Sequence, residues 1–116
     1  MLLCSGKLYY DLYQARAERK ITDTAIIRME QIYPLPVAEL KAVLGQFPNA
    51  EDFAWVQEEP ANQGAWSFVA LNLLEHLEGV RLRRISRPAA AAPAVGSAKM
   101  HEAEQAALIE AALPRP

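Results

Sequence analysis

The side chains best suited to chemistry in this sequence of 116 residues begin with an acidic, amide-rich run near its middle. Glu58 and Glu59 are adjacent carboxylates, and two like charges in a partly dry site can raise one pKa far enough for acid or base catalysis. Adjacent residues of an extended segment point to opposite sides, which disfavours such a pair. A capping or interface role fits better, because carboxylates and the amides of Asn62 and Gln63 favour the positive end of a helix that begins near Asn62. Direct contact with a ligand is the third alternative.

Two tryptophans, Trp55 and Trp66, bracket this run. Their neighbours Phe53, Phe68 and Val69 are apolar, so we expect both indole rings to anchor the core or a subunit interface rather than to stack on a ligand. We therefore expect this run to be a turn that contributes to an interface, with five candidate residues: Glu58, Glu59, Asn62, Gln63 and Trp66.

The second stretch is basic and runs from Arg81 through an alanine-rich connection to the start of the last expected helix. Guanidinium groups bind phosphate in a bidentate fork, and the free N–H groups of a helix start complete an anion site with a hydroxyl and an ammonium group. On this basis four side chains are expected to converge on one phosphate: Ser86, Arg87, Ser97 and Lys99. The alternative is that the arginines guard an exposed edge strand against pairing and that Ser97 only caps its helix.

The remaining candidates for chemistry are weak. Cys4 lies in an apolar strand-like run and is expected to be a small core residue rather than a nucleophile. His76 and His101 stand far apart on expected helices, without a partner for a catalytic triad or for a metal site. The sequence contains no glycine-rich phosphate motif and no metal motif, so it shows no complete active site.

Composition narrows the class of protein further. A net charge of −2 gives no electrostatic reason to expect nucleic acid, and no apolar stretch is long enough to span a membrane. With one cysteine no internal disulfide can form, which favours a reducing compartment, and we expect a cytoplasmic protein of one domain. Because the first expected strand begins at residue 2, with no residues before it that would cap or lead into it, we expect the chain to be a piece of a longer protein.

Hydrophobic periodicity alternates between strands and helices along the whole chain. Strands are expected at residues 2–4, 24–29, 52–56 and 80–85, and helices at residues 8–20, 37–47, 62–77 and 97–113. This pattern predicts an α/β fold, with a mostly parallel central sheet and helices on both faces. Ligands of such sheets gather at the carboxyl ends of the strands, so the loops of interest are residues 5–7, 28–36, 57–64 and 86–97.

Four motifs in order carry a family resemblance that covers nearly the whole chain. They are Leu-Cys-Ser-Gly-Lys-Leu-Tyr-Tyr-Asp-Leu (3–12), Ala-Ile-Ile-Arg-Met-Glu-Gln-Ile-Tyr-Pro-Leu-Pro (25–36), Gln-Glu-Glu-Pro-Ala-Asn-Gln-Gly-Ala-Trp (57–66) and Arg-Ile-Ser-Arg-Pro-Ala (84–89). In these segments the chain resembles the C-terminal domain of the E1 component of bacterial 2-oxoglutarate dehydrogenase.

The resemblance implies a transketolase C-terminal-domain-like fold, with residues 1–116 forming a single domain of a longer E1 chain. The full E1 oxidatively decarboxylates 2-oxoglutarate in the citric acid cycle with thiamine diphosphate and Mg²⁺, and passes the succinyl group to the lipoyl groups of the E2 succinyltransferase. In that family the preceding domains of a homodimer hold the cofactors. We therefore expect no catalytic, cofactor-binding or metal-binding residue here, and an isolated domain without activity that supports contact with the preceding domains and the second E1 subunit.

Some members of that family bind acetyl-CoA at this domain as an allosteric activator. The resemblance therefore makes five positions candidates for an anion site that takes acetyl-CoA or an adenine nucleotide: Arg28, Arg84, Arg87, Ser97 and Lys99. Two alternatives stay open, namely a purely structural dimerisation domain and a stand-alone module that binds nucleotides or acyl-CoA.

Overall fold

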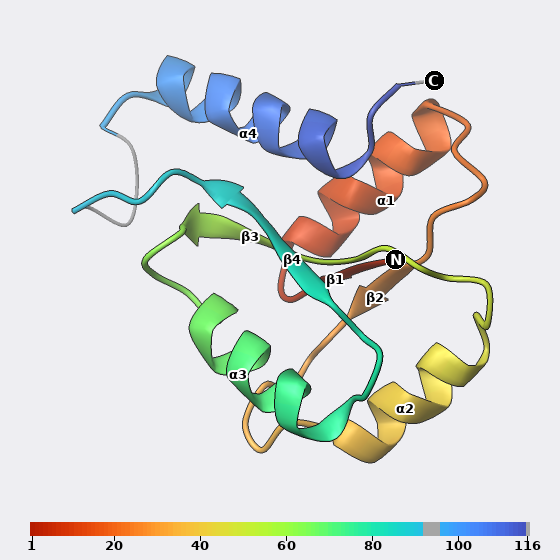
Figure 1. The fold of residues 1–116 in the computed structure, drawn as a ribbon. Coiled ribbons are helices and arrows are strands. Elements are labelled where there is room, and N and C mark those ends of the chain that lie inside the picture. Colours follow the sequence, from red (N-terminus) through yellow and green to blue (C-terminus); the bar gives the residue numbers. More distant parts are fainter. Residues whose placement is uncertain (92–95, 116) are drawn as a thin grey trace.

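The computed structural model describes residues 1–91 and 96–115 and, as expected, alternates strands with helices (Figure 1). Its elements are β1 (Leu2–Cys4), α1 (Leu8–Glu18), β2 (Ile26–Arg28), α2 (Val37–Gly45), β3 (Phe53–Pro60), α3 (Trp66–His76), β4 (Leu82–Arg87) and α4 (Ala98–Ala112). In the described part of the chain, no helix is long and apolar enough to cross a membrane.

The four strands form one parallel sheet in the order β2-β1-β3-β4, which confirms the predicted α/β class. In register, Leu3 of β1 lies between Ile27 of β2 and Trp55 of β3. From β1 the chain continues to β2 on one side of the sheet's centre, and from β3 it continues to β4 on the other side. The carboxyl ends of β1 and β3 therefore flank the point at which the strand order reverses, where open α/β sheets bind ligands.

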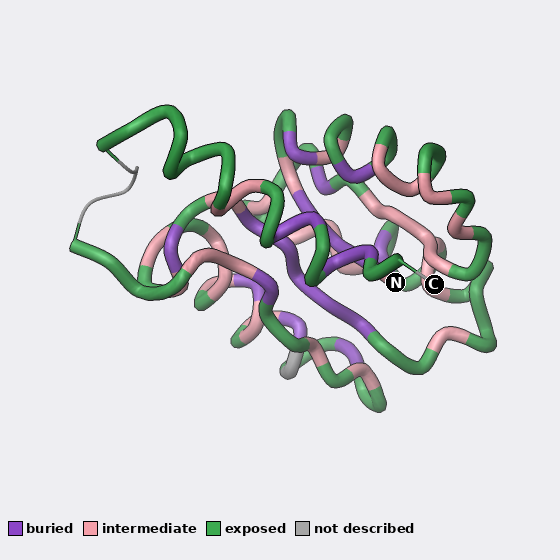
Figure 2. The backbone as a smooth tube through the Cα atoms, turned by 90° about the horizontal axis from the view of Figure 1, so that it is seen from above, coloured by how far each residue is buried: buried purple, intermediate pink, exposed green. Residues whose placement is uncertain are grey.

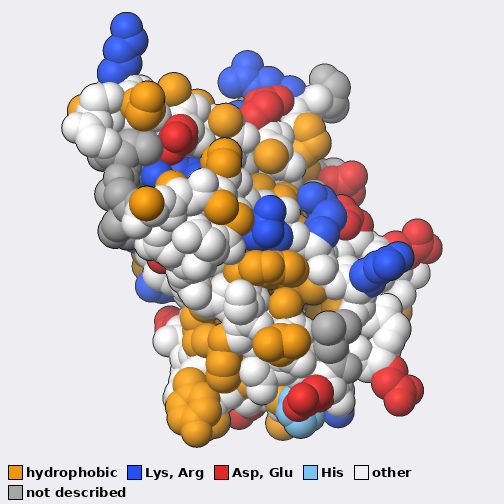
Figure 3. Space-filling model, turned by 60° about the vertical axis from the view of Figure 1, so that its left-hand side comes forward, with side chains coloured by type: hydrophobic (Ala, Val, Ile, Leu, Met, Phe, Trp, Pro, Cys, Tyr) orange, Lys and Arg blue, Asp and Glu red, His pale blue; other side chains and the backbone are white. Residues whose placement is uncertain are grey.

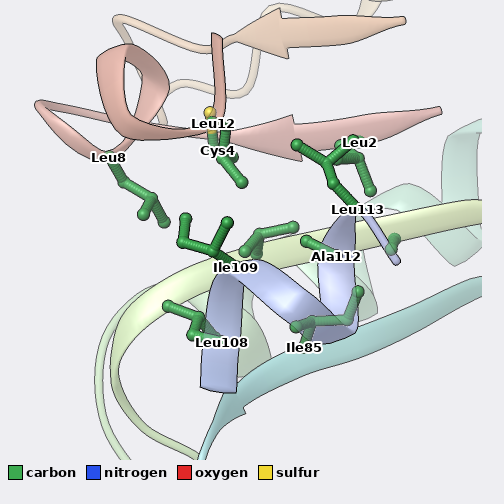
Figure 4. Close-up of a cluster of buried hydrophobic side chains, with 11 residues drawn as sticks. Leu2, Cys4, Leu8, Leu12, Ile85, Leu108, Ile109, Ala112 and Leu113 are labelled. Carbon is green, nitrogen blue, oxygen red and sulfur yellow. The ribbon is translucent and has the colours of Figure 1, made fainter. Parts of the chain in front are cut away.

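Helices cover both faces of the sheet, with α1 and α4 on one face and α2 and α3 on the other (Figure 1). Successive strand residues point to opposite faces, so Leu2 and Cys4 pack into one core and Leu3 into the other. The core beneath α1 and α4 includes Ile85 of β4 and Leu108 of α4 (Figure 4). Buried residues concentrate along the strands, and exposed residues lie on the outer turns (Figure 2).

The ends of two strands differ from the prediction. β3 continues to Pro60 instead of ending at residue 56, and β4 is shifted to Leu82–Arg87. The strands stay paired at Pro60 and Arg87, across an irregularity in which four steps along β3 oppose two along β4. The extra length of β3 comes from this pairing with β4, which a single-strand pattern does not reveal.

The helix predicted from residue 62 begins later, at Trp66. Gly64 has a φ of +70°, a left-handed conformation that interrupts a right-handed helix. α1 likewise ends at Glu18 rather than at residue 20, because Lys20 has a φ of 53°. Residues 61–65 therefore form a turn between β3 and α3, which we call the β3–α3 turn.

Candidate functional site

The β3–α3 turn is held by the side chain of Gln57, which is only 3% exposed. Its Nε2 donates to the carbonyl oxygens of Pro60 (2.9 Å) and Gln63 (2.8 Å), with a longer contact to that of Glu59. Its Oε1 accepts from the indole Nε1 of Trp55 at 2.9 Å and from the backbone N–H of Trp66 at 3.1 Å. A single buried amide therefore satisfies both ends of the turn, which fixes the turn's shape.

Gly64 fits tightly against this amide. A Cβ atom at position 64 would lie 3.0 Å from Oε1 of Gln57 and 3.1 Å from the side chain of Glu59. The positive φ at the same residue also favours glycine. Both the local backbone and the packing therefore require a residue without a side chain here.

Asn62 does not cap α3, contrary to the sequence-based prediction. The backbone N–H of Trp66 is capped by Gln57 instead, and no side chain caps the helix at its own N-cap residue, Ala65. Asn62 reaches the segment after β4, where its Nδ2 donates to the carbonyl of Ala90 (2.9 Å) and its Oδ1 accepts from the Ala90 N–H (3.0 Å). Gln63 also donates to the Ala90 carbonyl, at 3.1 Å. Asn62 and Gln63 thus join two loops at the carboxyl edge of the sheet.

The two adjacent carboxylates lie at the end of β3, not in the turn where they were expected, because β3 extends to Pro60. Glu58 accepts hydrogen bonds at Oε1 from Lys7 and from Gln105, both at 3.1 Å, and its hydrogen bond raises the pKa of Lys7. Glu59 instead lies against Gly64. The carboxylates therefore point to different surroundings and do not form an acid–base pair.

The predicted arginines are divided between the two edges of the sheet. Arg28 ends β2, whereas Arg84 and Arg87 belong to β4, and two strands lie between them. Three strand spacings amount to about 14 Å. Arg28 donates from Nη1 to the hydroxyl of Tyr10 at 3.2 Å and stacks over that ring. The structure therefore separates Arg28 from the other candidate anion ligands.

Arg87 is engaged with its own protein. Its side chain is 10% exposed, donates from Nε to the carbonyl of Glu58 at 2.7 Å and pairs from Nη1 with Glu104 at 3.1 Å. Ser86 Oγ donates to the Arg87 carbonyl at 3.0 Å. These contacts tie β4 to β3 and α4, and they direct both side chains toward protein groups.

Ser97 acts as the N-cap of α4, since its Oγ accepts from the N–H of Met100 at 3.1 Å. The helix cap expected of Ser97 is therefore present. Arg84 and Lys99 are exposed, and neither side chain makes a hydrogen bond or ion pair with the described residues. Residues 92–95, within the alanine-rich connection, lie outside the described part of the chain.

Comparison with known proteins decides the family. A family model described as 2-oxoglutarate dehydrogenase C-terminal matches residues 1–113. The chain belongs to the 2-oxoglutarate dehydrogenase C-terminal family.

Relatives of this 2-oxoglutarate dehydrogenase C-terminal domain include far longer proteins. It is 47% identical over 116 residues to the 2-oxoglutarate dehydrogenase E1 component of Cupriavidus necator, a match that covers 99% of this chain and 12% of that protein. It is 49% identical to the multifunctional 2-oxoglutarate metabolism enzyme of Mycolicibacterium vanbaalenii, covering 97% of this chain and 9% of that protein. It is 44% identical to the 2-oxoglutarate dehydrogenase E1 component of Haemophilus influenzae, a match that covers 97% of this chain and 12% of that protein. The chain therefore spans roughly a tenth of the length of these relatives.

Sequence reasoning missed the residues that organise the site of this 2-oxoglutarate dehydrogenase C-terminal domain, above all Gln57. The signal was available, because Gln57 stands two residues after Trp55 and residues so spaced share one face of a strand. Ending the expected strand at residue 56 placed Gln57 in a loop. Lys7, which precedes α1, and Gln105 of α4 both bind Glu58; they are distant from it in sequence and had no local signal.

Cys4 and the histidines of the 2-oxoglutarate dehydrogenase C-terminal domain have the places expected of them. Cys4 is fully buried, and burial raises the pKa of its thiol to about 11, although Arg28 opposes this shift. Cys4 is therefore a core residue and not a nucleophile. His76 and His101 are exposed on α3 and α4. Within the described ranges, no three His, Cys, Asp or Glu side chains stand together as a metal site.

Proposed function

We propose that this chain is the C-terminal assembly and regulatory domain of a 2-oxoglutarate dehydrogenase E1 protein. The observation that carries the proposal is the match of residues 1–113 to the family model, together with 44–49% identity to proteins of which it covers 9–12%. The whole protein would oxidatively decarboxylate 2-oxoglutarate in the cytoplasm and pass the succinyl group to a lipoyl-bearing E2 succinyltransferase.

Thiamine diphosphate and Mg²⁺ belong to other parts of that protein in this proposal. Mg²⁺ prefers several oxygen ligands at near-octahedral geometry. The described residues bring together no such group of acidic side chains, and Glu58 is occupied by Lys7 and Gln105. The chain's own contribution would be to support the preceding domains and the second E1 subunit of a homodimer.

The assembly role is supported by the carboxyl edge of the sheet. Tyr33, in the loop after β2, is 80% exposed and packs edge-on against Phe68 of α3. Trp66 stands at the start of α3 beside the rigid β3–α3 turn. The side on which β3 and β4 end carries hydrophobic side chains across its middle and lower part, among charged ones (Figure 3). Aromatic residues in such a setting are typical of interface cores.

A chimera tests this role. Residues 1–113 would replace the matching segment of the Cupriavidus necator E1 component. The mass of the assembly in solution and the rate of 2-oxoglutarate decarboxylation would be measured with thiamine diphosphate and Mg²⁺ present. We expect a dimer with activity, and loss of both when the segment is deleted. Tyr33→Ala should weaken the assembly, whereas Phe47→Ala, an exposed aromatic after α2 at the other end of the sheet, should not. Full activity of the deletion would contradict the proposal.

For the regulatory role we propose that Arg84 and Lys99 bind the phosphates of acetyl-CoA or an adenine nucleotide. Arg84 and Lys99 support this best, since both are exposed cations whose side chains pair with no described residue. Calorimetric titration of the chain and of the chimera with acetyl-CoA and with AMP is the test. Saturable binding that Arg84→Ala abolishes and Arg81→Ala preserves would support the regulatory role. Absence of binding in both proteins would leave a purely structural dimerisation domain.

A further inference from the structure

The outer surface of α1 and α4 carries a groove that the proposed function does not use. The groove is open to solvent and has a volume of about 760 Å³ between the two helices. Its walls are two helical stripes that face each other, made of Asp11, Gln14, Ala15 and Glu18 on α1 and of His101, Glu102, Gln105, Ala106 and Ile109 on α4. Residues spaced by three, four and seven lie on one side of a helix, so each stripe continues for two turns.

Small apolar side chains lie in the groove between the polar ones. Ala15 of α1 and Ala106 of α4 have side chains of a single methyl group, and Ile109 of α4 is buried. Small residues allow the backbone of another helix to approach closely. The groove is therefore suited to bind a third helix, as in helix-in-groove recognition.

The carboxylates of the groove are paired only with neutral groups. Asp11 accepts a hydrogen bond from Gln105 at 3.2 Å, and Glu18 accepts one from Gln14 at 2.9 Å. Glu102 makes no side-chain hydrogen bond or ion pair with the described part of the chain. An amide satisfies the hydrogen-bonding capacity of a carboxylate but leaves its charge in place.

The cations near the groove are paired with acids outside it, although Arg19 and Arg115 share a single carboxylate. Arg19 and Arg115 lie at one end of it, and both pair with Glu110, at 3.1 and 3.9 Å. Lys7, near Asp11, pairs with Glu58 at 3.1 Å. Asp11, Glu18, Glu102 and Glu110 are four carboxylates against the two guanidinium groups of Arg19 and Arg115, which leaves a net charge of −2 around the groove. Arg16, also on α1, donates to the Thr24 carbonyl and lies over the Tyr13 ring instead.

We propose that this groove binds a basic amphipathic helix of a partner protein. Asp11 and Glu18 are seven residues apart, which is about 10 Å along α1 on nearly the same side of the helix. Lysines or arginines at positions i and i+7 of the bound helix meet these two carboxylates, and a third cation between them meets Glu102. Small side chains on the same face of the partner pack against Ala15 and Ala106. The proposal does not depend on the activity of the whole E1 protein.

The test uses the 116-residue chain and two fluorescent alanine-based peptides of about 18 residues, long enough to form a helix. One peptide has lysines at i, i+4 and i+7, and the other has the same composition with its lysines spread around the helix. Fluorescence anisotropy at low and at physiological salt gives the affinities, and backbone amide shifts map the surface. We expect the first peptide to bind with shifts confined to α1 and α4, and the second to bind at least about tenfold more weakly.

A pair of charge-matched variants distinguishes the groove from general attraction. The triple variant Asp11→Asn, Glu18→Gln, Glu102→Gln removes the groove carboxylates. The control variant Glu39→Gln, Glu75→Gln, Glu78→Gln removes as much charge from exposed positions on α2, on α3 and just after α3. Only the variant that lacks the groove carboxylates should bind the peptide about tenfold more weakly. Its remaining binding should also depend less on salt concentration. Equal loss in both variants, equal binding of both peptides or absence of saturable binding would each overturn the proposal. Unchanged circular dichroism spectra control for folding.

Discussion

Gln57 Oε1 lies 3.1 Å from the backbone N of Trp66, so a buried strand residue caps the helix that begins nine residues later. The same amide holds the carbonyls of Pro60 and Gln63. A cap normally comes from the residue that precedes the helix, where its loss costs about 1 kcal/mol. Here the cap is buried and shared with the indole of Trp55, so the turn and the core depend on one side chain.

Replacing Gln57 by alanine should therefore be costly. Gln57→Ala leaves the indole N–H of Trp55 and several backbone groups without their partner, which we expect to lower the free energy of unfolding by about 2–4 kcal/mol. Urea denaturation measures this change. Gln46→Ala, at an exposed glutamine after α2, is the matched control and should change stability by less than about 0.5 kcal/mol. Similar values for both variants would contradict a structural role for the amide.

Position 64 should tolerate only glycine. Gly64→Ala places a Cβ 3.0 Å from Gln57 Oε1 at a residue with a φ of +70°, and we expect a loss of about 1–3 kcal/mol of stability. Gly45→Ala is the control, since Gly45 ends α2 and an added Cβ would meet nothing within 4 Å. That substitution should be neutral or stabilising by up to about 1 kcal/mol. Thermal unfolding of the two variants side by side gives the comparison.

Asn62 should control the mobility of the segment after β4. Asn62→Ala removes both hydrogen bonds to Ala90, so the Ala90 amide proton should exchange with solvent at least about tenfold faster, as measured by NMR. Asn62→Asp keeps the acceptor for the Ala90 N–H and should preserve most of the protection. Amides of β1, far from this contact, report on global unfolding and should be unaffected. Unaltered exchange at Ala90 in the alanine variant would show that Asn62 does not hold the segment.

The buried thiol of Cys4 should be inert and should make stability depend on alkaline pH. Because burial raises its pKa to about 11, the folded protein keeps the thiol protonated while the unfolded chain ionises near its ordinary value of 9.0. The stabilising contribution is therefore complete below about pH 9 and is lost between that pH and about pH 11. Denaturant titrations from pH 7 to pH 10.5 should show this loss, and Cys4→Ala should remove it. Thiol reagents at pH 8 should react only after unfolding.

Local pattern in the sequence determined the fold class and several individual roles. Alternation of strand and helix periods predicted a parallel sheet covered on both faces, because each apolar stripe must be buried against another element. Ser97 was recognisable as an N-cap candidate from its place before a helical period, and Cys4 as a core residue from its apolar run. These features depend on neighbours along the chain, which a sequence displays directly.

Only the tertiary structure decided which side chains meet. The strand order sets Arg28 and Arg87 on opposite edges, although both were expected at one anion site. Pairing of Pro60 with Arg87 extends β3 and turns Gln57 inward, so that this residue, rather than Asn62, caps α3. The groove between α1 and α4 joins stripes about ninety residues apart in the chain. Such relationships follow from strand order and packing across the core, and no local spacing encodes them.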